Sequence, residues 1–153
     1  MSRLTAVLMT SNCIFNYATD YAIKHPSIAK AEEFTLSDAE YQEFQTYALS
    51  QEFNYTTASE ESLKKMKETA EKEGYFDEIK SDYDDMISKV TPSKERDLIK
   101  FKAEISELLE NEIISRYYYQ KGRTVASLKN DPVVQKAIDI LTNSKEYNTI
   151  LKK

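Results

Sequence analysis

Glycine and proline are scarce in this chain, which has only 2 glycines and 3 prolines among its 153 residues. Average usage would give roughly 18 of the two together. Most β-sheet proteins and nucleotide-binding α/β folds need glycine for turns, bulges and phosphate loops. Two glycines cannot supply them, so the composition predicts an all-α protein. Walker and dinucleotide-binding loops are excluded directly, because Gly74 and Gly122 are 48 residues apart.

The chain also lacks the residues on which several kinds of site depend. Cys13 and His25 are the only cysteine and the only histidine, so we expect neither an internal disulfide nor a Cys/His zinc site. No apolar run approaches the ~20 residues of a membrane span. The apolar stretch Leu4 to Met9 is too short for a signal-peptide core, and we expect no export signal in this sequence. The formal net charge of −5 argues against binding of nucleic acid, which requires a basic surface.

A length of 153 residues fits one domain with a core of ordinary size. We therefore expect a single helical domain over residues 1–153. The best candidate for an internal boundary is Thr91-Pro92-Ser93, which would divide the chain into residues 1–91 and 92–153. Each part alone is small for a stable domain.

Helix signals are spread along the whole chain and predict an irregular bundle of about six or seven helices. Ser37-Asp38-Ala39-Glu40 is a capping box, and Thr57-Ala58-Ser59-Glu60 can form a second. Gly74 can end the helix that follows this second box, in the left-handed conformation. Asp131-Pro132 places a cap residue before a proline at the first helical position. Near the N-terminus two alternatives stay open, because Thr5 to Leu8 would suit a short strand as well as a helix.

The longest predicted helix covers residues 94–121 and begins after Ser93, which is its N-cap. Its first half has one apolar stripe, but its second half is apolar nearly all round the axis. Such a helix is buried on several sides, by the rest of the chain or by a partner. The candidate packing or interface residues are therefore Ile113, Ile114, Tyr117, Tyr118 and Tyr119. We expect Gly122 to end this helix.

Two groups of carboxylates resemble metal sites without completing the pattern. Asp82-Tyr83-Asp84-Asp85 resembles the start of a calcium loop, but Met86-Ile87 stands where that loop needs an oxygen ligand and a glycine. A second group lies at spacings of three along the long helix. Di-iron bundles combine such glutamates with histidines, and this helix has none. The second group consists of Glu104, Glu107 and Glu110, which we interpret as surface carboxylates.

No catalytic residue, cofactor or metal is predicted. A Cys13–His25 pair is the one conceivable nucleophile and base, but Cys13 lies beside apolar residues on a presumed core helix, where cysteines are usually inert. Stacking of nucleic-acid bases on residues 117–119, beside Lys121 and Arg123, would need an electropositive groove that an acidic chain does not favour.

Several segments resemble carboxyl-terminal processing (tail-specific) serine peptidases of the kind found in Bacteroidetes. Ile113 to Arg123, IISRYYYQKGR, is similar to a segment near the C-terminal end of those proteins. It is followed here by Asn130-Asp131-Pro132, which resembles their short acidic link, and by a terminal stretch, Tyr147 to Lys152. Upstream, Asn12 to Thr19, NCIFNYAT, resembles a helix that follows their peptidase core, and Phe53 to Thr57 is similar to the same region.

This resemblance implies that the chain is a fragment of a larger protein and lies C-terminal to a PDZ domain and a catalytic domain with a serine nucleophile and a lysine base. No serine or lysine here matches those catalytic motifs, so the fragment is expected to be non-catalytic. The parent would work in the cell envelope or periplasm. The fragment's partners would be the peptidase and PDZ domains of the same chain, with protein or peptide substrates and self-association as further options.

An independent helical module that holds a partner helix in a groove is the alternative function. A natural product of about the size of this chain would favour that alternative. A parent several times larger would favour the peptidase domain.

Overall fold

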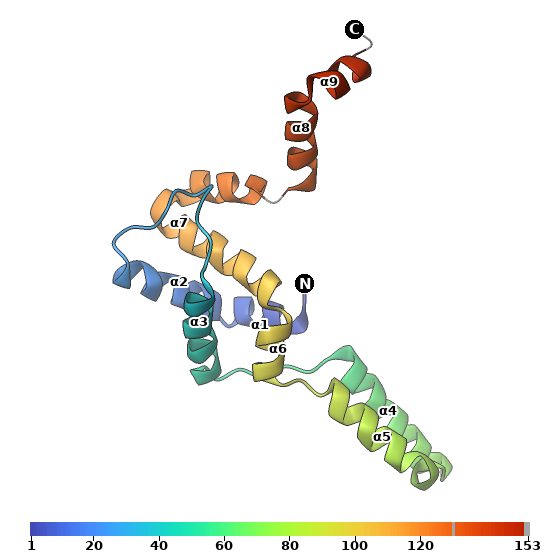
Figure 1. The fold of residues 1–153 in the computed structure, drawn as a ribbon. Helices are drawn as coiled ribbons and strands as arrows, with labels where there is room; N and C mark the ends of the chain where they lie inside the picture. The colour runs from blue at the N-terminus through green and yellow to red at the C-terminus, as the bar shows by residue number, and fades with distance from the viewer. Residues whose placement is uncertain (130, 152–153) are drawn as a thin grey trace. The chain divides into compact units, whose positions relative to one another are not determined.

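The computed structural model describes residues 1–129 and 131–151, and every regular element in this part of the chain is a helix. The all-α prediction is confirmed (Figure 1). The helices are α1 (Arg3–Thr10), α2 (Cys13–Lys24), α3 (Asp38–Ser50), α4 (Ala58–Glu73), α5 (Phe76–Val90), α6 (Lys94–Lys100), α7 (Lys102–Lys129), α8 (Pro132–Thr142) and α9 (Ser144–Ile150). Asn130 and Lys152, which belong to the segments compared above, lie outside the described residues.

The described residues form more helices than the sequence pattern predicts, partly because the N-terminal stretch is divided. Thr5 to Leu8 belongs to a helix and not to a strand, since α1 begins after Ser2, whose side chain accepts the Thr5 N–H. Asn12 separates α1 from α2 with a φ of 58°. Asparagine tolerates this left-handed conformation better than most residues, so the chain turns there and starts a second helix.

The prediction of one long helix over residues 94–121 is wrong in two ways. Phe101 separates α6 from α7, and the first helical part of α7 ends at the non-helical Tyr119, three residues before Gly122, where the sequence predicts the end; a second helical part continues to Lys129. In a continuous helix the Leu98 carbonyl would accept the N–H of Lys102. It accepts the Tyr41 hydroxyl instead, at 2.7 Å. A side chain inserted into the hydrogen-bond ladder is a recognised cause of a helix break.

The chain forms two compact units, each built from two separate stretches of sequence. The first unit contains Met1–Cys13 and Asp38–Ile105, and the second contains Ile14–Ser37 and the chain from Ser106 onward. These units do not follow the possible boundary at residues 91–93. That residues 1–153 behave as a single domain remains a prediction.

The core of the first unit lies where α6 packs against α1 and α3. At the edge of this core, the Lys102 ammonium forms an ion pair with Asp38 at 2.5 Å and lies 5.2 Å from the centre of the Tyr41 ring. The ammonium lowers the pKa of the Asp38 carboxyl through a hydrogen bond and through its charge. The large apolar side chains that are fully buried in this unit are those of Leu4, Leu8, Tyr41, Phe44, Leu98 and Ile105.

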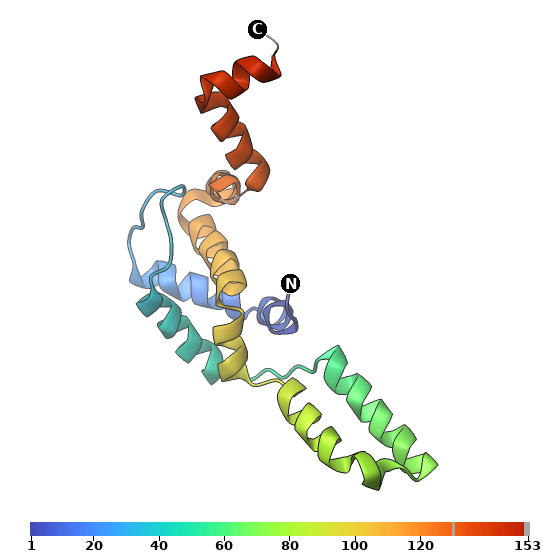
Figure 2. The ribbon, with the colours of Figure 1, turned by 45° about the vertical axis from the view of Figure 1, so that its right-hand side comes forward.

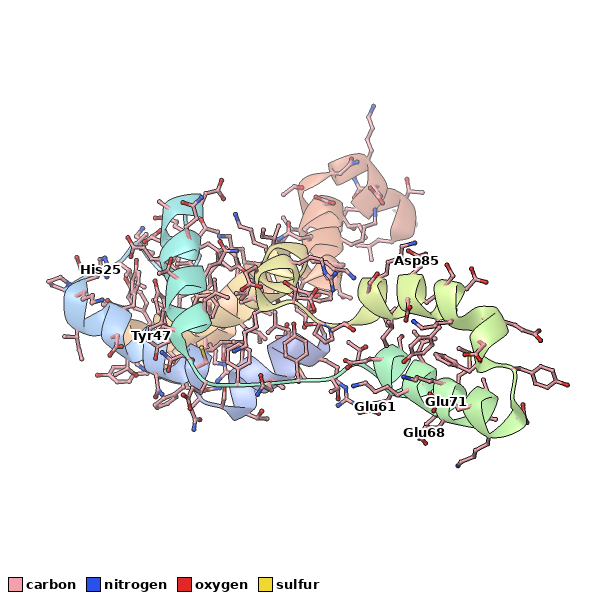
Figure 3. All side chains as sticks on the ribbon, turned by 90° about the horizontal axis from the view of Figure 1, so that it is seen from below. His25, Tyr47, Glu61, Glu68, Glu71 and Asp85 are labelled. Atoms are coloured by element: carbon pink, nitrogen blue, oxygen red, sulfur yellow. The ribbon has the colours of Figure 1, made fainter. Side chains whose placement is uncertain are left out.

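Helices α4 and α5 of the same unit lie side by side as an antiparallel hairpin (Figures 1 and 2). Thr57 caps α4 as predicted, and its hydroxyl also reaches the Val90 carbonyl at 3.3 Å, which joins the two ends of the hairpin. Gly74 ends α4 with a φ of 81°, as predicted. Figure 3 shows glutamates distributed along α4, and its exposed residues include Glu61, Glu68 and Glu71.

The second unit contains the aromatic residues of α2 and the connection that follows it. The Tyr21 ring stacks on His25 at a centroid distance of 4.0 Å and meets Phe34 edge-on at 6.4 Å. Asp131 caps α8 through the N–H groups of Val133 and Val134, with proline at the predicted first position. None of the helices in the described ranges is both long and apolar enough to cross a bilayer.

Candidate functional site

Two of the five predicted packing residues of α7 bind the connection between α2 and α3, and two others are buried. Ile113 and Ile114 are buried. The Tyr117 hydroxyl donates to the His25 carbonyl, and the Tyr118 hydroxyl donates to the Ala29 carbonyl at 3.1 Å. Burial raises the pKa of the Tyr117 hydroxyl above its ordinary value. These two tyrosines therefore fix a stretch of the chain that has no regular structure of its own.

Two charged residues of α7 hold the later part of the same connection. Glu110 Oε1 accepts the Leu36 N–H at 2.9 Å, and the Lys129 ammonium lies 3.4 Å from the Phe34 carbonyl. Burial raises the pKa of Glu110, although the hydrogen bond from Leu36 and the nearby Lys129 act in the opposite direction. The side chain of Glu110 is thus a structural acceptor, in contrast to the surface carboxylate that the sequence predicts.

Arg116 joins α7 to α2. Its guanidinium lies 4.3 Å from the centre of the Phe15 ring and donates to the Phe15 carbonyl and the Thr19 hydroxyl, both at 3.2 Å. Glu112, one turn earlier, accepts another of its N–H groups at 2.8 Å. Because each contact uses a different face or donor of the guanidinium, Arg116 fixes the register between the two helices of the second unit.

Tyr119 is placed differently from its neighbours. Its backbone has φ 54° and ψ −155°, which interrupts α7, and 77% of the residue is exposed. A tyrosine in this region of φ/ψ space is strained. Gly122 follows the interruption and is buried against Ile114 and Tyr118. Of the five predicted residues, two are buried, two are half-buried and Tyr119 is open to solvent. That the five together form an interface stays a prediction.

Helices α8 and α9 leave apolar side chains uncovered. No described residue of α8 is buried, although one face of this helix is apolar. Val133 is 76% exposed and Leu141 is 67% exposed. Among the described side chains, Ile138 of α8, Tyr147 of α9 and Leu151 just after α9 are also large, apolar and exposed. Several large apolar side chains exposed on one pair of neighbouring helices are typical of a surface that contacts a partner.

Cys13 and His25, the residues considered as a nucleophile and a base, have environments that suit packing. Cys13 is 3% exposed, and burial raises the pKa of its thiol to about 11. A nucleophilic cysteine needs the opposite shift, because the thiolate is the reactive form. His25 Nδ1 lies 2.9 Å from the Tyr21 carbonyl, and its ring stacks on Tyr21.

Four of the carboxylates considered as metal ligands, Asp84, Asp85, Glu104 and Glu110, have other partners. Asp84 pairs with Lys80 at 2.7 Å, and Asp85 pairs with Lys89 at 2.6 Å. Glu104 accepts the Ser2 N–H at 2.8 Å. Within residues 1–129 and 131–151 no three histidine, cysteine or acidic side chains are grouped closely enough to hold a metal ion.

The first unit contains a pocket that the sequence pattern does not reveal. It has a volume of about 290 Å³ and is formed by the start of α1, the segment before α4 with the first turn of α4, the end of α5, and α6 with Phe101 after it. Within its wall, the buried Asp97 accepts the Tyr55 hydroxyl at 2.8 Å and the Arg96 Nε at 3.4 Å. Burial and the adjacent Asp97 raise the pKa of Tyr55. The lining residues come from four separate stretches of sequence, so no local motif could have identified them.

Comparison with curated proteins and with solved structures gave no significant match. Comparison with protein families gave a match to the C-terminal helical domain of a probable PDZ-protease, over residues 4–141. The matched range includes all but the ends of the chain and runs from α1 nearly to the end of α8. It therefore includes the α7 segment, the connection that α7 holds, and the lining of the pocket of the first unit except Ser2 and Arg3. The chain belongs to the family of C-terminal helical domains of PDZ-proteases.

Proposed function

We propose that this chain is the non-catalytic helical domain at the C-terminal end of a carboxyl-terminal processing serine peptidase of the Bacteroidetes type. Membership of the PDZ-protease family supports the parent class. The resemblance of residues 12–19 and 113–123 to tail-specific peptidases supports the finer assignment. The serine nucleophile, its lysine base and the PDZ domain belong to the preceding part of the parent chain, which works in the periplasm.

The domain packs on the peptidase core of the same chain. The observation that carries this proposal is the uncovered apolar face of α8, with Val133, Ile138 and Leu141 open to solvent. Burying such side chains contributes roughly 1.5–3 kcal/mol each, so a partner that covers α8 gains substantially. Of the five predicted packing or interface residues of α7, Tyr119 contributes to this interface, because it is the exposed one.

The other members of that group stabilise the surface from within. Ile113 and Ile114 fill the interior, and Tyr117 and Tyr118 anchor the connection between α2 and α3. In this arrangement the domain positions the peptidase core or guides an unfolded polypeptide toward it, and it takes no part in bond cleavage.

The size of the natural product tests the parent assignment. An antibody raised against the chain should detect, on an immunoblot of the native organism, a protein several times larger than 153 residues. A band at the mass of this chain would contradict the assignment and favour an independent interaction module. The purified chain alone should not cleave peptides with unstructured C-terminal tails. Cleavage that a serine-directed reagent abolishes would refute the non-catalytic role.

Complementation between separate chains tests the proposed contact. The PDZ and peptidase portion should bind the chain when the two are produced as separate polypeptides. Val133→Asp combined with Leu141→Asp should weaken this binding at least tenfold, because both substitutions place a charge on the apolar face. The control carries Lys145→Gln and Asn148→Asp, which change the charge by the same amount at exposed polar positions of α9. Equal affinities of the two double variants would refute docking through α8.

A further inference from the structure

The pocket of the first unit has a positive lining, although the chain has a net charge of −5. Four cationic side chains line its volume of about 290 Å³: Arg3 from α1, Lys89 from α5, and Arg96 and Lys100 from α6. The one carboxylate in the lining is Asp97. Cations from three helices therefore converge on one space, where the attraction for an anion is stronger than at an open surface.

Two of these cations have no acidic partner. Lys89 is paired with Asp85, and Arg96 is paired with Asp97. By contrast, no carboxylate in the described ranges lies within ion-pair distance of Arg3 or Lys100. Their charge is therefore available to a ligand. Because neither side chain holds the fold through an ion pair, each can be replaced without removing a structural contact of that kind.

Arg96 is held in place before any ligand arrives. Its Nε donates to Asp97, and one terminal nitrogen donates to the Thr91 carbonyl at 2.6 Å. Asp97 is only 6% exposed and is itself fixed by the Tyr55 hydroxyl. A guanidinium fixed in this way loses little conformational entropy on binding, and its remaining donors match a planar carboxylate.

The rest of the lining combines uncharged polar residues (Ser2, Tyr55, Thr57 and Ser59) with apolar ones, and the apolar residues favour an anion that carries an apolar group. Leu4, Val90 and Phe101 contribute to the wall. The volume lies at the low end of the ~300–1,000 Å³ typical of ligand pockets, so the ligand is small. The buried charge of Asp97 disfavours a dianion such as phosphate more than it disfavours a single carboxylate.

We propose that this pocket binds a carboxylate joined to a small apolar group. Either the apolar C-terminal residue of a peptide or a free organic acid could provide this group. The inference depends on the pocket alone and stands whether or not the proposed parent is correct.

Calorimetric titration of the whole chain with four probes tests the proposal. The probes are acetyl-alanyl-leucine, its C-terminal amide, isovalerate and inorganic phosphate. The free acid of the dipeptide should bind at least tenfold more tightly than the amide and than phosphate. Isovalerate distinguishes the two sources. If isovalerate binds as tightly as acetyl-alanyl-leucine, the pocket is assigned to free acids. If isovalerate binds much more weakly than the dipeptide, the pocket is assigned to peptide ends. Three outcomes would overturn the proposal. The first is that neither acetyl-alanyl-leucine nor isovalerate gives heat of binding at 10 mM. The others are that the dipeptide acid and its amide bind equally tightly, or that phosphate binds more tightly than either carboxylate.

Substitutions locate the binding. Arg3→Gln and Lys100→Gln should each weaken binding of the better carboxylate about tenfold and leave the circular dichroism spectrum unchanged. Lys65→Gln is the matched control, because Lys65 is an exposed lysine of the same unit and does not line the pocket. If Lys65→Gln weakens binding as much as the pocket variants do, the attraction is not specific to the pocket and the proposal is refuted.

Discussion

Gly122 lies against Tyr118 so closely that a Cβ atom on the glycine would overlap the Cβ of the tyrosine. The same atom would lie 3.2 Å from Ile114 Cγ2. In an uninterrupted helix, residues 118 and 122 would be neighbours one turn apart, with Cβ atoms roughly 5–6 Å apart. The turn at Tyr119 removes that separation. Gly122 is therefore required by a close approach between two parts of α7.

Gly122→Ala should destabilise the chain by about 2–3 kcal/mol, because the overlap is with the rigid base of a side chain and not with its flexible end. Urea unfolding followed by circular dichroism measures the effect. Gly74→Ala is the control, since its Cβ would meet nothing within 4 Å and only the φ of 81° opposes it. We expect a cost of about 1 kcal/mol there. A Gly122→Ala variant as stable as the native chain would show that α7 does not turn as described.

Tyr119→Gly should stabilise the chain or leave its stability unchanged. Glycine tolerates the φ of 54° and ψ of −155°, and relief of the backbone strain is worth about 1–3 kcal/mol. The greater freedom of glycine in the unfolded chain offsets part of this gain. Little burial is lost, because the tyrosine is mostly exposed. Tyr119→Ala keeps the strain and provides the comparison. Thermal unfolding should give a higher Tm for Tyr119→Gly than for Tyr119→Ala. The reverse order would contradict the strained geometry.

Tyr41→Phe should destabilise the first unit by about 1–2 kcal/mol. The variant leaves the Leu98 carbonyl without its hydroxyl donor in a buried site. It should also allow α6 and α7 to join more often, since the ladder bond from Lys102 to Leu98 becomes available. Hydrogen exchange at the Lys102 amide measures the second effect. Faster exchange in the variant would contradict this account of the break at Phe101.

Alkaline pH should destabilise the chain, and Tyr41 should account for part of the effect. Burial raises its pKa to about 12 from an ordinary value of 10.0. Between these values the folded state holds the proton and the unfolded state releases it, so the free energy of unfolding falls as pH rises from 10 to 12. The contribution of one such group is at most about 3 kcal/mol. Denaturant titrations across this range should give a smaller pH slope for Tyr41→Phe. An unchanged slope would refute the assignment.

Sequence patterns predict the features of this fold that depend on neighbouring residues. Thr57 caps α4, Gly74 ends it, and Asp131 caps α8, because each bond joins groups only a few positions apart. The interruption at Phe101 depends on a hydroxyl 57 residues from the carbonyl it binds. Periodicity contains no information on such a contact, so the prediction of one long helix was wrong.

In the candidate sites too, the sequence predicts what depends on neighbouring residues and does not predict what depends on tertiary contacts. The burial of Ile113 and Ile114 agrees with the apolar pattern of α7, whereas nothing in three successive tyrosines indicates that Tyr119 turns the chain. Glycine is rare in this chain, and the position of Gly122 in the sequence predicts a helix end. The sequence does not predict the close approach of Gly122 to Tyr118. Arg3 and Lys100 are ordinary surface residues in the sequence, and only the tertiary structure brings them to one pocket.

The division of each unit into two stretches has a consequence for synthesis on the ribosome. Helix α1 contributes Leu4 and Leu8 to the first core, and its partner α6 begins only at Lys94. The earliest helix to leave the exit tunnel must wait for roughly ninety further residues before its apolar side is covered. During that interval its leucines are accessible to chaperones. An N-terminal fragment that stops within α6 lacks residues of both cores. A chain truncated within α6 should therefore not fold stably.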